Sequence, residues 1–553
     1  MKTFKNIKYI GLLAVAISFT ACSDEEDFEE LLDQPPTQEA NLPALTSGSA
    51  DFSNFVSLGA SFTAGFTDGA LFIAAQENSF PNTLSNKFAM ANGGAFNQPL
   101  MEDNTGGMII TSPGADDLPY RLVFNIETQR PQNLDSYLLT IGEIVPPITT
   151  ISNESLAADG RIFENVGVPG AKSTHIGLNG YASLNPYFGR FANSPTVSML
   201  EYAIAQNPTF FTLSEIGGND VLGYATSGGE SDTTSDNYDP ITPTTTFDFV
   251  FNDMVNQLTA VTPNGVVTNV PYITDLPHFT TVPYNPLDPT NPDFGPQIPL
   301  LNSIFGALNP IFEAVDPARA IVFSTTEASP VVIKDETLDD ISAIISAQLN
   351  ASPTFPAFIA QFGLTAQAAP LVANLLGATY GQTRQATPAD LLVLPSSSII
   401  GTVNEANVGA LMGQGLPQAL AGQFSVEGVS LPLEDKWVLL PSEQDEIQTA
   451  TDAYNATIAN VASTKGLALV DLNGILSQAS STGIMFDDYN LTTNLATGGL
   501  VSLDGIHLTA RGYALMANKF LEAIDLTYGS NFIASGNVAK AEDFGVTYSP
   551  TLQ

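Results

Sequence analysis

From residue 51 onward, short apolar runs that end in glycine-rich turns alternate with segments whose apolar residues recur at helical spacing. This alternation is typical of an α/β domain built around a parallel sheet. We expect five strands in that sheet: Phe55–Leu58, Ile162–Val166, Phe210–Ile216, Val266–Tyr272 and Leu467–Leu472. In a parallel sheet, ligands and catalytic groups gather beyond the carboxyl ends of the strands, so the turns after these runs are the first place to look for a site.

Helical spacing is clearest in Glu446–Ala462 and Ala510–Ile524. Two long stretches, about 90–160 and about 275–440, do not fit a minimal core of strands and helices. We interpret both as insertions, mainly of helices or loops, into one domain spanning 51–530. Residues 531–553 are then a C-terminal tail.

The second insertion contains an unusually apolar stretch, because residues 341–426 include only three charged side chains, Arg384, Asp390 and Glu405. Prolines interrupt this stretch, which argues against a lipid-exposed helix. Two interpretations stay open. The stretch forms a packed helical cap over the main domain, or it forms an apolar lid that lines an acyl pocket.

Residues 1–21 combine three early lysines with the apolar run Ile10–Ala21, and they precede Cys22, the only cysteine of the chain. A basic start followed by about 12 apolar residues is typical of a cleaved secretory signal, since a membrane-spanning helix needs about 20. The end of the run resembles the lipobox of bacterial lipoproteins. That resemblance implies lipid attachment at Cys22; the alternative is a cleaved signal followed by an incidental cysteine.

Residues 22–50 are first acidic and then rich in polar residues and proline, so we expect a disordered tether. The acidic run after Cys22 also resembles the export signal of some surface lipoproteins of Gram-negative bacteria. We therefore expect an exported, outer-membrane lipoprotein, with display at the cell surface as one option. With Cys22 acylated, neither a disulfide nor thiol chemistry is available.

The strongly negative net charge of the chain argues against nucleic acids and anionic lipid surfaces as partners. The chain has 17 basic and 57 acidic residues, which gives a net charge of −40. Nucleic acids and anionic lipid headgroups would be repelled by such a surface, so membrane contact is expected only through the lipid anchor. Hydrophobic residues make up 44% of the chain, which is ample material for a large core.

Two segments carry residues suited to nucleophilic catalysis. Ser61 follows the first predicted strand in the sequence GASFTAG, and serines at such strand-to-helix turns are often nucleophiles. Asp504 and His507 precede the last predicted helix. A histidine can take the serine proton, and a carboxylate can fix the histidine tautomer. The alternative role of Asp504 is to cap that helix.

Two further segments could stabilise negative charge. Asn219 lies in the sequence GGND after the third predicted strand, where its amide could donate to an oxyanion. Gly170 ends the sequence NVGVPG after the second strand, where its backbone N–H could point to the same place. Taken alone, Asn219 is also compatible with an ordinary turn asparagine.

In the order Ser, Gly, Asn and Asp-x-x-His, these segments together resemble the SGNH, or GDSL-type, hydrolase superfamily. The resemblance covers residues 55–525 and implies a flavodoxin-like three-layer α/β/α sandwich. It also implies Ser61 as nucleophile, His507 as base and Asp504 as the group that orients it. The implied oxyanion hole consists of the Ser61 and Gly170 N–H groups and the Asn219 side chain. The sequence departs from the family pattern at Ala60, where aspartate is usual, and in its wide spacing between motifs.

We therefore expect a lipid-anchored serine ester hydrolase that acts on carboxylic esters through an acyl-enzyme, as a monomer and without cofactor or metal. Acyl esters or lipids and acetylated glycans compete as substrates, so a carbohydrate O-acetylesterase is one alternative. A non-catalytic surface binding lipoprotein on the same fold is the other. We interpret His175 and His278 as loop or core histidines. Asp288, Asn291 and Asp293 lack EF-hand spacing and are interpreted as loop residues.

Overall fold

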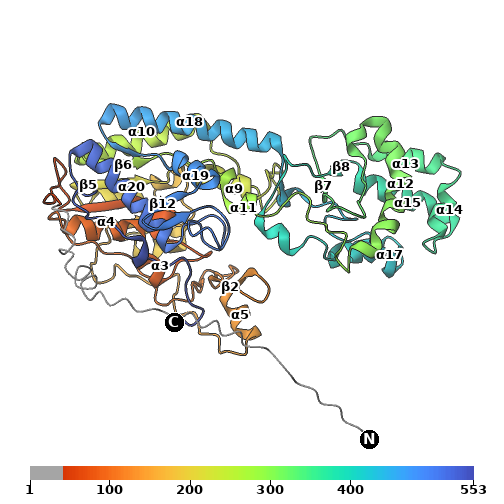
Figure 1. Ribbon diagram of the computed structural model, residues 1–553, viewed down its shortest axis with the longest axis horizontal. Helices are drawn as coiled ribbons and strands as arrows, with labels where there is room; N and C mark the ends of the chain where they lie inside the picture. The colour runs from red at the N-terminus through yellow and green to blue at the C-terminus, as the bar shows by residue number, and fades with distance from the viewer. Residues whose placement is uncertain (1–41, 553) are drawn as a thin grey trace, which may run out of the picture. The chain divides into compact units, whose positions relative to one another are not determined.

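The centre of the fold is a five-stranded sheet in which all strands run parallel (Figure 1). The computed structural model describes residues 42–552, so the predicted signal peptide, Cys22 and most of the predicted tether lie outside the described residues. The strands lie in the order β11, β6, β5, β1, β4. Their bounds are β1 Phe55–Gly59, β4 Asn165–Gly167, β5 Phe210–Ser214, β6 Gly265–Thr268 and β11 Ala468–Val470. The predicted α/β class and the parallel sheet of about five strands are confirmed.

The strands form where apolar residues are continuous, because both faces of the sheet are covered. Every residue of β1, β5 and β6 is buried. Every predicted strand differs from the observed one at one or both ends, and β6 and β11 are both shorter than predicted. The local cause is clear at two boundaries. The second strand begins at Asn165 because Ile162 is 53% exposed and lies outside the sheet. The third ends at Ser214 because Glu215 adopts a left-handed backbone conformation (φ +55°) that cannot continue a strand.

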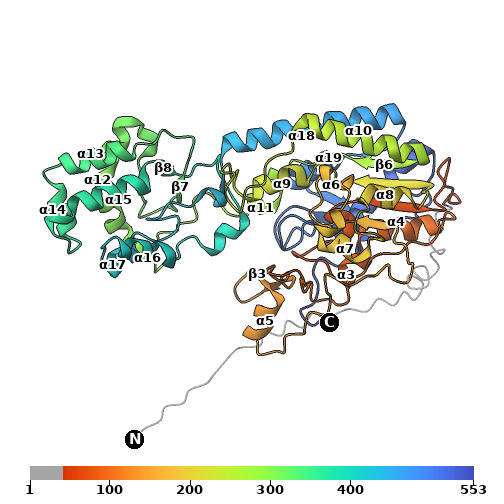
Figure 2. The same ribbon diagram turned by 180° about the vertical axis from the view of Figure 1, so that it is seen from behind.

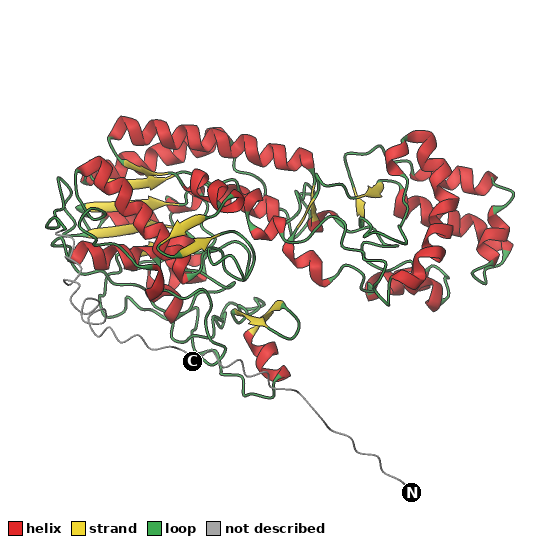
Figure 3. Ribbon diagram, viewed as in Figure 1, coloured by secondary structure: helices red, strands yellow, loops and turns green. Residues whose placement is uncertain are grey.

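Helices pack on both faces of the sheet (Figures 2 and 3). On one face, α10 (Thr244–Val261) and α18 (Pro441–Lys465) pack side by side, and they share a core with Leu58 and Leu213 of the strands. On the other, α4 (Phe80–Ala89) and α20 (Ala510–Tyr528) share a core with Phe55 and Phe210. The helices α18 and α20 contain the two segments predicted from helical spacing.

Shorter elements join these layers. The helices among them include α2 Ser61–Ala64, α3 Ile73–Glu77, α6 Ser173–Ile176, α7 Pro186–Phe191, α8 Met199–Ile204, α9 Asn219–Thr226, α11 Pro277–Thr280 and α19 Leu472–Ser481. Small antiparallel pairs are β2 Leu122–Asn125 with β3 Arg130–Asn133, β9 Leu391–Leu392 with β10 Val438–Leu439, and β12 Ile484–Phe486 with β13 Tyr489–Leu491.

Neither predicted insertion contributes a strand to the central sheet. Residues 90–160 contain the β2–β3 hairpin and α5 (Leu134–Thr140). The segment after residue 530 is not a free tail in its described part, because Phe532 is buried in the core beneath α20 and Arg121 donates to the Ser549 carbonyl at 2.7 Å.

Residues 282–440 are here called the second lobe (Figure 1). Their buried apolar side chains form a hydrophobic core of their own. Its elements are α12 Ile298–Val315, α13 Ser342–Ala351, α14 Phe355–Ala360, α15 Ala369–Tyr380, α16 Glu405–Gly413, α17 Gln418–Gln423, and the pair β7 Val332–Lys334 and β8 Thr383–Gln385. By length and composition alone, 295–315 is the one described helical segment that could cross a membrane. Leu301, Phe305 and Phe312 of that segment pack inside the lobe, as in a core helix of a folded domain.

Candidate active site

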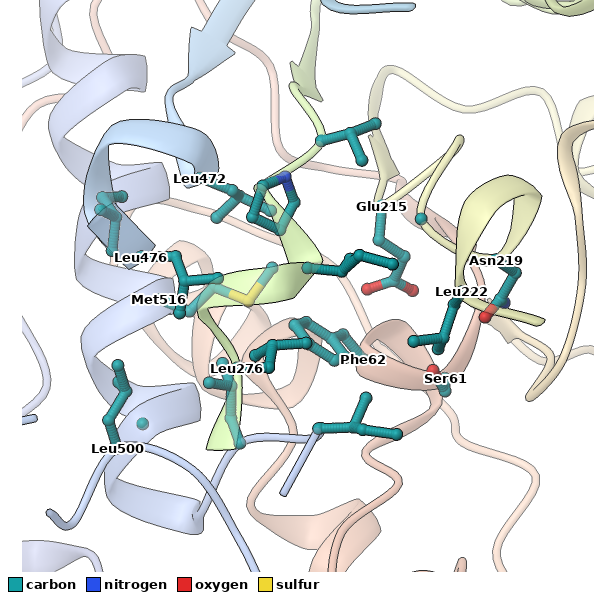
Figure 4. A pocket seen from close by; sticks show the side chains of 18 of the residues that line it. Ser61, Phe62, Glu215, Asn219, Leu222, Leu276, Leu472, Leu476, Leu500 and Met516 are labelled. Atoms are coloured by element: carbon teal, nitrogen blue, oxygen red, sulfur yellow. The ribbon is translucent and has the colours of Figure 1, made fainter. Parts of the chain in front are cut away.

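Ser61 is the first residue of α2, immediately after β1, and is 8% exposed (Figure 4). Two positions around this sharp turn have no room for a side chain: Gly59, which precedes it in β1, and Gly167 in the neighbouring strand β4. A Cβ on Gly59 would lie 2.1 Å from Thr63 Oγ1 and 2.8 Å from the Ser214 carbonyl. A Cβ on Gly167, in β4, would lie 2.2 Å from the Ala64 nitrogen. The backbones of β1, α2 and β4 therefore approach each other closely enough to fix the position of Ser61.

Gly170 follows β4 and Asn219 follows β5, and the two residues lie close to each other. Gly170 has a φ of +79°, and a Cβ at that position would meet open space. Asn219 begins α9, and its Nδ2 donates to the carbonyl of Ala171 at 2.9 Å. Within residues 42–552, no acceptor binds the backbone N–H of Ser61 or of Gly170. Both donors are thus available to a ligand at the carboxyl ends of β1 and β4.

Two buried side chains tie these loops together. Asp220, next to Asn219, accepts from the backbone N–H of Ser173 at 2.9 Å and from its hydroxyl at 2.6 Å. Asn165 of β4 donates to the Thr63 carbonyl at 2.9 Å. The loop that carries Gly170 is thus held by Asp220 of α9, and the turn that carries Ser61 is held by Asn165 of β4.

His507 and Asp504 lie in the turn before α20 and are in direct contact. The Nδ1 atom of His507 is 2.9 Å from Asp504 Oδ2. With Nδ1–H donating to this carboxylate, Nε2 is left as the proton acceptor. The carboxylate also accepts from four other donors, which are the backbone N–H groups of Gly69, Ile506 and His507 and the hydroxyl of Ser502.

These contacts keep Asp504 charged. Burial alone would raise its pKa, but the charge of His507 and the hydrogen bonds from His507 and Ile506 outweigh burial and hold the pKa of Asp504 below its usual range. The contacts match the predicted orienting role. The alternative, a helix cap, falls instead to Thr509, whose hydroxyl accepts from Gly512 N–H.

The His507 ring lies beside the α2 segment. Its centroid is 5.6 Å from that of Phe62, which follows Ser61, and 4.6 Å from that of Phe66. Ser61 Oγ and His507 are not hydrogen-bonded to each other. Catalytic hydrogen bonds are often longer in ligand-free enzymes and shorten when substrate binds.

An apolar pocket opens at Ser61 (Figure 4). Ser61, Glu215 and Asn219 are on one side of it. The rest of the wall is almost entirely aliphatic and comes mainly from α9, α19, α20 and the loop after β6; it includes Leu222, Val270, Ile273, Leu276, Leu472, Ile475, Leu476, Leu500, Leu515 and Met516. No lining residue belongs to 341–426, so the lid that we considered for that stretch does not form this pocket. Its apolar residues pack inside the second lobe instead.

One residue of this site, Glu215, was not predicted from the sequence. Its Oε1 accepts from the backbone N–H groups of Ala60 at 2.6 Å and Thr63 at 2.9 Å, on either side of Ser61. Burial raises the pKa of Glu215 to about 8, while the N–H donors act in the opposite direction. The signal in the sequence was an acidic residue at the end of an otherwise apolar strand.

The other histidines and the acidic loop have different surroundings. His175 accepts from Lys172 N–H at Nδ1 (3.1 Å) and stacks on Tyr181. His278 is buried but not satisfied, since neither ring nitrogen has a hydrogen-bond partner among residues 42–552. Asp288 accepts from Thr290 in a local turn, as expected for a loop residue.

Three carboxylates that were not predicted to meet also lie close together in the structure. Oxygens of Glu336, Asp435 and Glu443 lie within 4.8 Å of one another, between the second lobe and α18. Burial, followed by repulsion from Glu336, raises the pKa of Asp435 to about 7. Burial and the contact with Glu336 raise the pKa of Glu443 to about 10.

Comparison of the chain with known proteins found no matching family model, no matching curated protein and no matching solved structure.

Proposed function

We propose that the chain is a serine ester hydrolase of the SGNH type. The observation that carries the proposal is that Ser61 and Asn219 line one pocket together with Ile506 and Leu508, the two neighbours of His507 in the sequence. His507 is paired with Asp504, and Asn219 binds the carbonyl of Ala171, which follows Gly170. The strand order supports it. Numbered along the chain from the β4 edge, the strands read 2-1-3-4-5, which is the flavodoxin-like order, and helices cover both faces.

In the proposed reaction, Ser61 Oγ attacks the ester carbonyl and His507 Nε2 takes the hydroxyl proton. Asp504 stabilises the imidazolium that results. The oxyanion would accept from the N–H groups of Ser61 and Gly170 and from the second N–H of the Asn219 amide, since the first is bound to Ala171. His507 returns the proton to the leaving alcohol. A water then attacks the acyl-enzyme by the same route.

The pocket favours esters of fatty acids over acetylated glycans. An acyl chain bound to Ser61 would extend along the aliphatic wall formed by α19 and α20. Each buried methylene contributes about 0.8 kcal/mol of transfer free energy, so a chain of several carbons gains far more here than an acetyl group. We propose medium or long acyl esters as substrates. We retain export, lipid attachment at Cys22 and a monomeric state as parts of the proposal.

The first test is hydrolysis of p-nitrophenyl esters from acetyl to palmitoyl by the form lacking residues 1–22. We expect turnover that rises with chain length beyond acetyl and is abolished in Ser61→Ala. Ser53→Ala, an exposed serine before β1, is the matched control and should behave as wild type. Labelling by a fluorophosphonate should require Ser61.

Other outcomes would change the proposal. Activity confined to acetyl esters would favour the glycan deacetylase. Absence of both turnover and labelling would favour a binding protein on a hydrolase scaffold.

A further inference from the structure

The turn that carries Ser61 lacks a capping side chain of its own. Ala60 is the N-cap residue of α2, and its methyl group cannot accept a hydrogen bond. The first N–H groups of a helix have no partner within the helix, and a side chain at the N-cap position usually accepts from them. Here the acceptor comes from another strand, because Glu215 at the end of β5 binds the N–H groups of Ala60 and Thr63 with one oxygen.

Glu215 is itself held in an unusual conformation. Its φ of +55° lies in the left-handed region, which non-glycine residues seldom adopt. Its backbone N–H donates to Thr268 Oγ1 of β6 at 2.8 Å. Such conformations persist where the surroundings determine them, and they concentrate at functional sites. The end of β5 thus places this carboxylate beside the first turn of α2 (Figure 4).

The N–H of Ser61 lies in sequence between the two N–H groups that Glu215 binds, and it has no acceptor among residues 42–552. Fixing the peptide groups on both sides fixes the direction of this free donor. We propose that Glu215 is a positioning residue that aims the Ser61 N–H, and with it Oγ, at the reacting carbonyl. This inference rests on the ester-hydrolase function proposed above.

The ionisation of Glu215 allows a test through the pH dependence of kcat, which does not depend on the stability of the fold. A charged carboxylate accepts hydrogen bonds more strongly than a neutral one. Because its pKa is about 8, kcat should rise as the pH increases through this value. Tyr513 of α20 is the titratable side chain that interacts electrostatically with Glu215, and burial raises its pKa well above 10, so it stays neutral in this range.

The test compares three variants with wild type, using p-nitrophenyl butyrate. Glu215→Ala should lower kcat about 10-fold to 100-fold, less than the 10²–10³ lost when an oxyanion donor is removed, with KM nearly unchanged. Glu215→Gln keeps a carbonyl acceptor and the side-chain volume. It should stay within about threefold of wild type at pH 7 but lose the rise near pH 8.

The third variant is the double change Ala60→Asp with Glu215→Ala. An aspartate at the N-cap can accept from the N–H groups of the first helical turn, so it should recover at least about tenfold of the lost kcat. A Glu215→Ala variant as active as wild type would overturn the inference. So would a Glu215→Gln variant that keeps the pH 8 limb. Wild type that hydrolyses no ester and is not labelled at Ser61 would instead overturn the proposed function and this inference together. Should Glu215→Ala not fold, Glu215→Gln alone decides through its pH profile.

Discussion

At the scale of single residues, Asp504 is the position that we expect to tolerate substitution least. Its two oxygens accept five hydrogen bonds. An amide nitrogen in place of Oδ2 would face two donors, the Gly69 N–H and the His507 ring N–H. We expect Asp504→Asn to lower kcat by about 10³–10⁴, with KM little changed, as for an orienting carboxylate replaced by its amide. The measurement is steady-state hydrolysis of p-nitrophenyl butyrate.

Asp471→Asn is the control for that change. Asp471 also accepts at a helix start, from Gly474 N–H at 2.9 Å, but it lies outside the site. It should keep kcat within about twofold. An Asp504→Asn enzyme of near wild-type activity would show that Asp504 does not orient the catalytic base.

Asn219 tests the oxyanion hole. We expect Asn219→Ala to lower kcat about 10²–10³-fold, because one of three donors to the developing negative charge is lost. Asn252→Ala on the exposed face of α10 is the matched control, since its amide makes one local hydrogen bond to Asp248. Parallel melting curves check whether loss of the bond to Ala171 disturbs the fold. An unchanged kcat would remove Asn219 from the mechanism.

At the scale of secondary-structure elements, α19 and α20 are expected to determine chain length. Leu476 of α19 lines the pocket at Ser61. Leu476→Trp should fill the space for the distal acyl chain and lower kcat/KM for palmitoyl relative to acetyl esters at least about tenfold. Leu526→Trp on the exposed face of α20 is the control and should leave the ratio unchanged. A ratio equally insensitive to Leu476→Trp would place the acyl chain elsewhere.

The elements were predicted to different degrees. Short apolar runs predicted the five strands, since burial on both faces of the sheet requires them, and helical spacing predicted α18 and α20. The contact of Asp504 with His507 followed from a separation of three residues. The contact of Glu215 with Ala60 joins residues 155 positions apart, and only the pairing of β5 with β1 brings them together. Sequence spacing alone contains no information about that pairing.

The pocket was missed for a related reason. Its wall combines residues after β6 with residues of α19 and α20, segments separated by the whole second lobe. The most apolar stretch of the sequence, 341–426, suggested an acyl site instead. In the structure most of its apolar side chains pack in two hydrophobic clusters of that lobe. Two of its three charges, Arg384 and Asp390, pair with each other at 2.7 Å.

At the scale of the whole molecule, the acidic composition leaves buried carboxyl groups whose protonation is coupled to folding. Burial raises the pKa of Asp68 to about 7, and Asp435 and Glu443 are raised as well. Between the ordinary pKa of an unfolded carboxyl, about 4, and these values, the native state binds more protons than the unfolded chain. The contribution of these three groups to stability is therefore fully present at low pH and is lost as the pH rises through the raised values.

The coupling between protonation and folding can be tested at Glu443, which lies where the second lobe meets α18. Glutamine mimics its protonated form and can still accept from Leu440 N–H, which Glu443 binds at 2.7 Å. At pH 5, where Glu443 of the folded wild type is protonated, we expect Glu443→Gln to melt within about 2 °C of wild type. At pH 9 we expect it to melt several degrees higher than wild type, because ionisation of Glu443 lowers the free energy of the unfolded wild-type chain. Glu405→Gln, exposed in the first turn of α16, should shift neither value. A Glu443→Gln melting temperature that follows wild type in parallel from pH 5 to pH 9 would show that folding does not raise the pKa of Glu443.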